Sequence, residues 1–201
     1  MRETNQFTHP RRDRQRGIYA VEFALVAIIF FLMVFGIVEF ARMLYVFNTV
    51  HEVTRIATSA AVHANFNDTD RMQQIREVSV FRSTPGILPL AGPISDQYVR
   101  IEYLAMTDDG SGNTEITEIP ENQLPDNPLE NRQICMANPN AANCVRYVRT
   151  RICKPGTAAA CDRAEVTLMI PLVSFTVRVP RATYILPVES LGYKPGMASW
   201  L

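Results

Sequence analysis

The longest apolar stretch of the chain lies near its N-terminus and has the length of a membrane-spanning helix. The run from Phe23 to Val38 contains no charged or strongly polar residue, and Glu22 and Glu39 bracket it. Counted from Ile18, the stretch is about 21 residues long, close to the roughly 20 that a helix needs to cross about 30 Å of hydrocarbon. Backbone amides in lipid must be hydrogen-bonded within the segment, so a single span must be helical. The alternative, a buried helix of a soluble protein, would need a larger core than this chain builds.

The helical pattern continues beyond this span. Apolar and small residues recur at intervals of three and four, which predicts one helical face made of Phe40, Met43, Leu44, Phe47, Val50, Thr54, Ala57 and Ala61. Arg42, Glu52 and Arg55 fall at other positions, which indicates a solvated surface. No proline interrupts the stretch from Ile18 to about His63, so one helix roughly 70 Å long is expected. Its first half would lie in lipid and its second half would pack against a soluble domain.

A second, shorter helix and a loop follow. The polar residues 65–70 (NFNDTD) are expected to end the long helix, and one of residues 68–70 would cap a helix that begins near Arg71. The buried stripe of that helix would consist of Met72, Ile75, Val78 and Phe81. Residues 83–93 contain three prolines and two glycines and therefore predict a loop.

The remainder of the chain has the pattern of β-strands. Strands are expected at residues 98–106, 115–119, 144–152, 164–179 (bent at Pro171) and 181–188. Both faces of the 144–152 segment mix apolar and charged residues, which favours an edge strand over a central one. Its arginines, Arg146, Arg149 and Arg151, would face solvent or the acids of residues 115–130. The order of elements predicts an α+β fold: a long N-terminal transmembrane helix continuing into a small antiparallel-sheet domain with disulfides.

The distribution of charge gives the chain an orientation in the membrane. Lysine plus arginine equals aspartate plus glutamate at 20 each, so no bulk attraction to nucleic acid is implied, and nucleic acid is not an expected partner. Five arginines precede the span, opposed by two acids: Arg2, Arg11, Arg12, Arg14 and Arg16 against Glu3 and Asp13. Basic residues ahead of a span and few just after it place the N-terminus in the cytoplasm. Residues after about position 40 are then exported.

All four cysteines fall in the exported part of the chain. An even number in an oxidising compartment predicts disulfides, and Cys135, Cys144, Cys153 and Cys161 allow three pairings. We favour the sequential one, Cys135–Cys144 and Cys153–Cys161. The spacings are nine, nine and eight with no C-x-x-C pair, so neither a zinc site nor a redox motif is expected.

Residues arranged for catalysis are not found in the sequence. No serine, histidine and acid are placed for nucleophilic chemistry, and no glycine-rich phosphate loop follows a strand. His51 and His63 are twelve residues apart, too far to bind one ion together. We expect no catalytic residue, no metal and no cofactor, and hence a protein that is not an enzyme.

The junction between the basic leader and the apolar helix carries the most specific signal. The leader ends at Gly17, and five residues later Glu22 stands inside the apolar helix. A carboxylate in a span costs about 2.5 kcal/mol or more at bilayer depth, so it requires a partner. Cleavage between Gly17 and Ile18 would free an amine one helical turn from Glu22, and the amine of a neighbouring subunit would serve equally. Glu22 would then be favourable only where a partner amine sits beside it.

These residues resemble the type IV pilin superfamily and, more closely, the TadE-like pseudopilins of tight-adherence (Flp) pilus systems. Gly17, residues 18–21, Glu22 and Phe23 carry the resemblance, together with the GIVEFAR and RIATSAA stretches farther along the helix. The resemblance covers about residues 14–64. It implies cleavage after Gly17 by a prepilin peptidase and a place in the inner membrane with a periplasmic C-terminal domain. The implied partners are other pilins and the pilus assembly machinery.

The resemblance also implies the minor class of subunit. Major Flp pilins are much shorter and usually carry tyrosine after the glutamate, whereas this chain has Phe23 and a long exported domain. We therefore expect a cleaved leader at 1–17, a helix at 18–64 with about 18–38 in the membrane, and a periplasmic α+β domain at 65–201.

Three other interpretations stay open. One is an uncleaved single-pass anchor in which Glu22 reaches the interface. A conventional secretory signal peptide is disfavoured because its apolar region would be too long and no small-x-small site follows it. The functional alternative is a membrane-anchored periplasmic binding or adhesion domain that is neither processed nor part of a filament.

Overall fold

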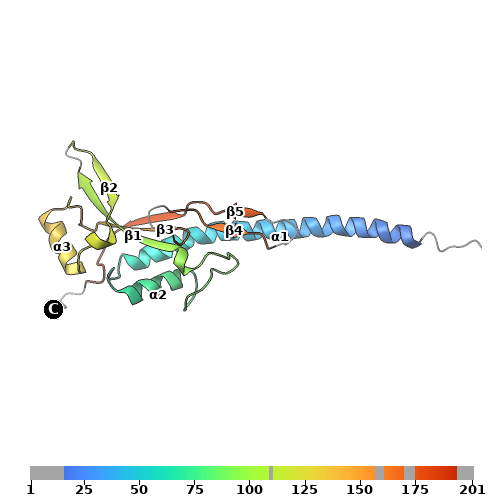
Figure 1. Cartoon of the computed structure of the whole chain (residues 1–201), viewed down its shortest axis with the longest axis horizontal. Helices are drawn as coiled ribbons and strands as arrows, with labels where there is room; N and C mark the ends of the chain where they lie inside the picture. The colour runs from blue at the N-terminus through green and yellow to red at the C-terminus, as the bar shows by residue number, and fades with distance from the viewer. Residues whose placement is uncertain (1–15, 109–110, 157–160, 170–174, 194–201) are drawn as a thin grey trace, which may run out of the picture. The chain divides into compact units, whose positions relative to one another are not determined.

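The computed structural model describes residues 16–108, 111–156, 161–169 and 175–193. The chain divides into two compact units, Met1–Ala41 and Arg42–Leu201, which we call the N-terminal and C-terminal units. Helix α1 (Arg16–Ala61) contributes to both. The predicted α+β class is confirmed, because one long apolar helix precedes a small antiparallel domain with two disulfides (Figure 1).

In the C-terminal unit, α1 buries a stripe of small and branched residues. Met43, Val46, Val50, Val53, Ala57 and Ala61 are buried. Phe40 and Leu44, which the pattern places on this face, are exposed, so that part of the prediction is wrong. At about 100° per residue, the stripe follows the steps 43, 46, 50, 53 and 57, and Leu44 points more than 100° away from its centre. Arg42 lies at the edge of the stripe rather than on the solvated face, and it is buried.

Helix α2 (Thr69–Ser79) starts where its cap residue predicts. The Asp68 carboxylate accepts a hydrogen bond from the Arg71 backbone N–H at 2.9 Å, which satisfies one of the free donors of the first turn. Met72 and Ile75 are buried as predicted, whereas Val78 and Phe81 are exposed, which corrects the predicted stripe.

The polar contacts of α2 and the end of the helix explain that correction. Gln73 Nε2 donates both to Glu77 and to Asp96, at 3.0 Å each, so the polar residue Glu77 takes a buried position in place of Val78. The helix then ends at Ser79, and Phe81 has a φ of +60°. The chain therefore leaves the helical direction before Phe81, and Val80 is fully buried instead.

Four strands form the main sheet in the order β2-β1-β3-β6, all antiparallel. Their bounds are β1 Val99–Asp108, β2 Thr114–Glu118, β3 Tyr147–Ile152 and β6 Thr183–Pro187. The strands expected at 98–106, 115–119 and 181–188 are confirmed. The expected edge position of the 144–152 strand is wrong, because β3 lies between β1 and β6. The register of the strands explains this difference. Arg149 stands opposite Glu102 on β1, so the Glu102 carboxylate neutralises the arginine charge within the sheet.

The segment expected as one bent strand at 164–179 folds back on itself instead. It forms two short strands, β4 (Glu165–Thr167) and β5 (Thr176–Arg178), which pair antiparallel as a separate sheet. Each strand is three residues long, and the antiparallel pairing sets Val166 opposite Val177. Pro171, the expected bend, lies outside the described residues.

Helix α3 (Pro128–Ala137) was not predicted, although its start carries a clear signal. The Asn127 side chain accepts from the Glu130 N–H at 2.9 Å, and the Glu130 carboxylate accepts from the Asp126 N–H at 2.7 Å. Reciprocal bonds of this kind are close to a capping box, and Pro128 suits the first turn. Two short 3-10 helices, η2 (Asp96–Tyr98) and η3 (Glu121–Gln123), complete the described elements.

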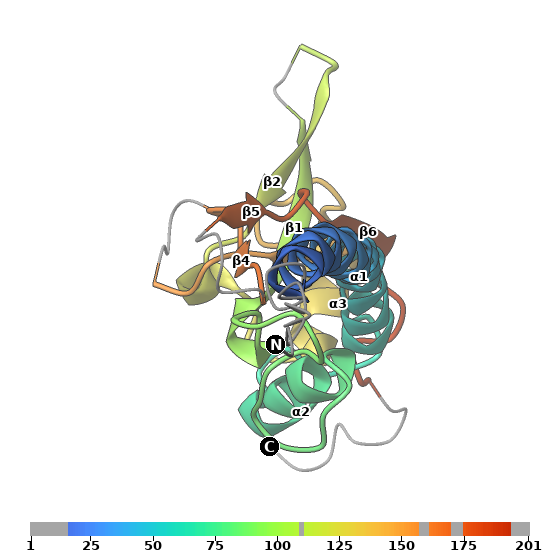
Figure 2. The ribbon, with the colours of Figure 1, turned by 90° about the vertical axis from the view of Figure 1, so that its right-hand side faces the viewer.

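The two faces of the main sheet have opposite character. One face contributes Val148, Tyr103 and Ala105 to the core, and the rings of Tyr103 and Phe66 lie 5.4 Å apart. Figures 1 and 2 both show the C-terminal half of α1 between the strands and α2. The other face carries the charged residues Glu102 and Arg149, so it is the face that offers polar groups for binding.

Candidate functional site

The residues that the sequence singles out for processing lie together in the first two turns of α1. The helix begins at Arg16, and Gly17, Ile18, Glu22 and Phe23 are all exposed. Apart from its chain neighbours and the adjacent helix backbone, no described atom lies within 4 Å of the position that a Cβ on Gly17 would take. Since residues four apart share a helical face, Ile18 and Glu22 are neighbours. A free amine at Ile18 would therefore lie one turn from the Glu22 carboxylate. The leader residues 1–15 fall outside the described residues.

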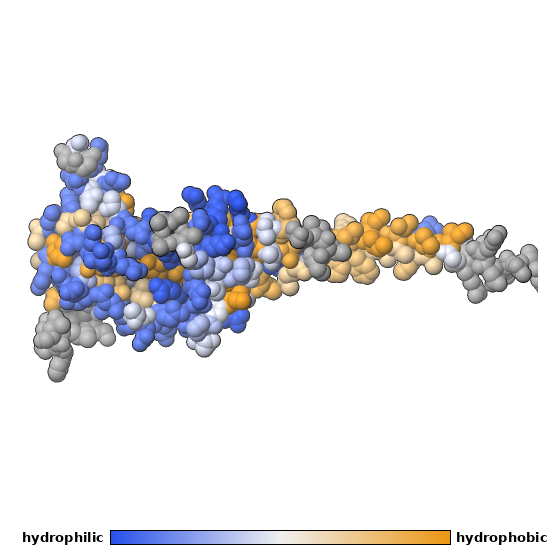
Figure 3. All heavy atoms as spheres, in the orientation of Figure 1, coloured by the Kyte–Doolittle hydropathy of each residue, from blue (hydrophilic) through white to orange (hydrophobic). Residues whose placement is uncertain are grey.

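Helix α1 also has the composition of a membrane span. Among the described residues, one helix is long and apolar enough to cross a membrane, and none of its apolar window is buried. In Figure 3 the N-terminal unit presents a nearly continuous hydrophobic surface, whereas the surface of the C-terminal unit is mostly hydrophilic. An exposed apolar helix of this length suggests single-pass membrane anchoring.

Two disulfides staple the C-terminal unit in the sequential pattern. Cys135 of α3 is bonded to Cys144, and Cys153 at the end of β3 is bonded to Cys161. The two bonded cysteines are nine residues apart in the first disulfide and eight in the second. A disulfide that closes a loop of this size stabilises the fold by roughly 2–3 kcal/mol, because it restricts the unfolded chain. The bonds hold both ends of the β3 region, and no cysteine remains free.

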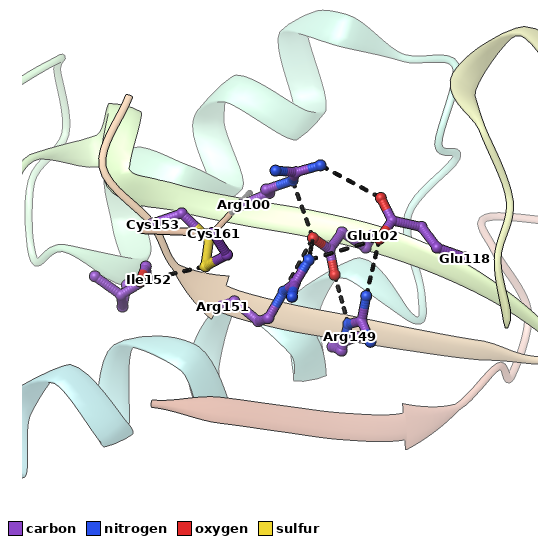
Figure 4. Close-up of a disulfide and its surroundings, with 8 residues drawn as sticks. All are labelled: Arg100, Glu102, Glu118, Arg149, Arg151, Ile152, Cys153 and Cys161. Atoms are coloured by element: carbon purple, nitrogen blue, oxygen red, sulfur yellow. Dashed lines mark hydrogen bonds and ion pairs between the residues drawn. A yellow bond between two sulfur atoms is a disulfide. The ribbon is translucent and has the colours of Figure 1, made fainter. Parts of the chain in front are cut away.

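A cluster of opposite charges covers the polar face of the sheet next to the second disulfide (Figure 4). The Glu102 side chain is 2% exposed and lies between three guanidinium groups, those of Arg100, Arg149 and Arg151. The Nε atoms of these arginines approach it at 2.9, 2.5 and 3.0 Å. Glu118 of β2 is more exposed and accepts from Arg149 at 2.9 Å. We call these five residues the Glu102 cluster; it has three positive and two negative charges.

A cleft of about 320 Å³ opens beside this cluster. Arg149 and Arg151 line it together with Arg163, Arg181 and Cys161. Arg163 and Arg181 are exposed, so they add two positive charges to the surplus of one in the Glu102 cluster. The volume of the cleft is at the lower end of the range of roughly 300–1,000 Å³ that is typical of small-ligand pockets. Guanidinium groups bind carboxylates and phosphates in two-pronged fashion, so the cleft suits an anionic group.

Metal chemistry finds no support in the part of the chain that the structure describes. No group of three or more histidine, cysteine, aspartate or glutamate residues there is placed to hold an ion. His51 and His63 are both exposed, and His63 Nδ1 lies 3.5 Å from a Glu189 carboxylate oxygen.

Sequence reasoning missed the importance of Arg42 and Glu102. Arg42 was expected to be solvated, but its two terminal nitrogens donate to the carbonyls of Leu90 and Thr167, at 2.6 Å each. Spacing along α1 gives no sign of partners 48 and 125 residues away. Glu102 had a possible signal: it is an acid in the middle of a strand pattern, with Arg100 in the same strand segment and further arginines in the segment at 144–152.

Comparison with known proteins places the long helix in a described family pattern. Residues 17–58 match the family model described as "TadE-like protein", which confirms the resemblance over most of α1. Members of this family are associated with tight-adherence pili and have structural roles. Neither a curated protein nor a solved structure matches the chain.

Proposed function

We propose that this chain is a minor pilin or pseudopilin that takes part in assembling a tight-adherence pilus. The observation that carries the proposal is that one helix combines the family match at residues 17–58 with an apolar window of which no part is buried by the described residues. Such a helix can exchange lipid for the helices of neighbouring subunits. The role is structural rather than catalytic.

The proposed maturation step is cleavage between Gly17 and Ile18 by a prepilin peptidase at the cytoplasmic face. Both residues are exposed at the start of α1, directly after the arginines of the leader. Those arginines support a cytoplasmic N-terminus, with the disulfide-stapled C-terminal unit in the periplasm. The proposed domains are the leader at 1–17, the helix at 18–64 and the periplasmic part at 65–201.

Mass spectrometry of the protein from its own envelope tests this step. We expect a mature N-terminus at Ile18, and Gly17→Ala should slow or block processing. Gly36→Ala is a matched control, because Gly36 is another glycine of α1 whose added Cβ would meet no described atom within 4 Å beyond its chain neighbours and the adjacent helix backbone. An intact Met1 N-terminus in cells whose peptidase trims other pilins would refute the maturation step.

The proposed role of Glu22 is to set register between subunits. Its carboxylate is exposed on an apolar helix, so burial beside other helices is favourable only with a cationic partner. Glu22→Ala should therefore insert normally into the inner membrane but enter pili less efficiently. Glu52→Ala, a change on the same helix outside the span, should leave piliation intact. Unchanged incorporation of the Glu22 variant would remove this role.

The second candidate function is a membrane-anchored periplasmic binding or adhesion domain, and the arginine-lined cleft favours it. On this proposal the C-terminal unit keeps its ligand when residues 18–41 are replaced by an unrelated anchor. A labelled hexaglutamate peptide is a suitable probe of the cleft, read by fluorescence anisotropy. Arg181→Ala should weaken its binding, whereas Arg71→Ala on α2 should not. Equal binding by both variants would remove the argument for this function.

A further inference from the structure

Four large apolar side chains stand exposed on two loops of the C-terminal unit. Ile87 and Leu90 are 50% and 58% exposed, and Met169 and Phe175 are 66% and 59% exposed. We call these four residues the apolar collar. Single exposed apolar residues are ordinary on protein surfaces, so their exposure matters only because of where the two loops are fixed.

Arg42 fixes both loops to the same point of α1. One terminal nitrogen of its guanidinium donates to the Leu90 carbonyl and the other to the Thr167 carbonyl, at 2.6 Å each. Met169 lies two residues beyond Thr167, and the Leu168 N–H bonds to the Phe175 carbonyl at 3.3 Å, which brings Phe175 to the same hairpin. A charged side chain with only 8% exposure in these bonds holds the loops firmly.

Chain connectivity then places the collar close to the end of the apolar run. Arg42 follows Val38 by four residues of continuous helix, which is about 6 Å of rise. Even a fully extended chain of four residues spans at most about 14 Å. The polar headgroup region adds roughly 5–7 Å on each side of the hydrocarbon core. If Val38 ends the hydrocarbon span, Arg42 and the two loops bonded to it lie at the headgroup level.

We propose that the apolar collar is a lipid-binding surface that inserts into the periplasmic leaflet around the point where α1 leaves the membrane. Apolar side chains at this depth are stabilised by the boundary between headgroups and acyl chains. Arg82, which is exposed and donates from Nε to the Ile87 carbonyl at 3.0 Å, adds a positive charge beside lipid phosphates. The inference rests on the membrane anchoring in the proposed function, and it adds a second point of contact that orients the C-terminal unit on the bilayer.

Single tryptophans in the full-length protein test the collar. Trp200, which is the one tryptophan of the chain, is first replaced by phenylalanine. Leu90→Trp and Met169→Trp then report on the collar from two separate loops, so the failure of one variant to fold leaves the other. Met136→Trp is the exposed control on α3, which Figure 1 shows at the opposite end of the C-terminal unit from β4 and β5. Phe31→Trp reports on the span itself.

Each protein is reconstituted in phosphatidylcholine–phosphatidylglycerol vesicles with brominated acyl chains, and quenching of fluorescence is measured. We expect Leu90→Trp and Met169→Trp to be quenched severalfold more than Met136→Trp, at every protein-to-lipid ratio. Quenching of Phe31→Trp without quenching at positions 90 and 169 would overturn the collar and leave the anchor standing. No quenching of Phe31→Trp would overturn the anchor and the collar together. Quenching at positions 90 and 169 that is weak at a high protein-to-lipid ratio and rises as the protein is diluted in lipid would assign the surface to a second copy of the chain and overturn lipid as its occupant.

Discussion

Replacement of Glu102 by glutamine tests how far the Glu102 cluster stabilises the C-terminal unit. The substitution keeps the shape of the side chain and removes its negative charge. It leaves three guanidinium groups around an amide whose NH2 group cannot accept a hydrogen bond. Because Glu102 stands in β1 opposite Arg149 of β3, the strain falls on the central pair of strands.

The expected cost follows from burial. Removal of one partner of a buried ion pair typically costs about 3–5 kcal/mol, because the other charge is left uncompensated. Here Arg100, Arg149 and Arg151 keep 21–28% of their side-chain surface exposed, so they regain part of their hydration. The amide oxygen still accepts from one of them. We therefore expect Glu102→Gln to lower the free energy of unfolding by about 2–3 kcal/mol, below the full range.

Thermal unfolding of the full-length protein in detergent, followed by near-ultraviolet circular dichroism, measures this cost. At about 2–4 °C per kcal/mol for a domain of this size, Tm should fall by roughly 4–12 °C. Glu118→Gln is the matched control, because Glu118 contacts the same arginines but is 38% exposed. Exposed pairs contribute about 0–1 kcal/mol. Equal losses in the two variants would refute the argument from burial, as would a Glu102 effect that 1 M salt abolishes.

Three further changes test single features of the C-terminal unit by the same unfolding assay. Thr150→Val should leave stability unchanged or raise it by up to about 1 kcal/mol, because the buried Thr150 hydroxyl makes no hydrogen bond to any described residue; a large loss would contradict this. Gly192→Ala should destabilise by about 1–3 kcal/mol, since Gly192 has a φ of +76° and an added Cβ would lie 2.8 Å from the Asn65 backbone nitrogen; an unchanged Tm would contradict it. Burial raises the pKa of the Tyr103 phenol, with a smaller opposing effect of Arg76. The neutral phenol therefore stabilises the fold at neutral pH, and this stability is lost as pH rises above about 10. Tyr103→Phe should weaken the alkaline loss, while Tyr184→Phe, which alters an exposed ring, controls for removal of a hydroxyl.

The parts of the fold that depend on local periodicity could be predicted from the sequence. Helix α1 needs only an apolar run without proline, and its extent at Arg16–Ala61 agrees closely with the expected one. Strand β1 could be found because Arg100 and Glu102 alternate with apolar residues in its first half. The Asp68 cap could be found because an aspartate just ahead of a helix commonly accepts a hydrogen bond from a backbone N–H of the first turn.

The parts that depend on pairing between distant segments could not be predicted. The segment at 164–179 has strong strand character throughout, and nothing local indicates that its two ends pair with each other as β4 and β5. The position of β3 in the sheet is a similar case. Its mixed faces suggest an edge only if arginine is assumed to need water, and that assumption fails once Glu102 lies opposite Arg149.

Arg42 and Arg149 show the same physical point from two places in the fold. Each is a charged residue at a position where periodicity alone predicts contact with solvent, and each is held by oxygens from segments at least 31 residues away. A guanidinium is weakly hydrated and offers five donors in a plane, so it can leave water where several oxygens meet. A domain of this size has a limited apolar core. Its distant segments are also held together by arginines that bind carbonyls and carboxylates, and by two disulfides. This explains why the loops at Arg42 can present apolar side chains outward without collapsing onto the helix: their backbones are already fixed by hydrogen bonds, so the side chains remain available for another surface.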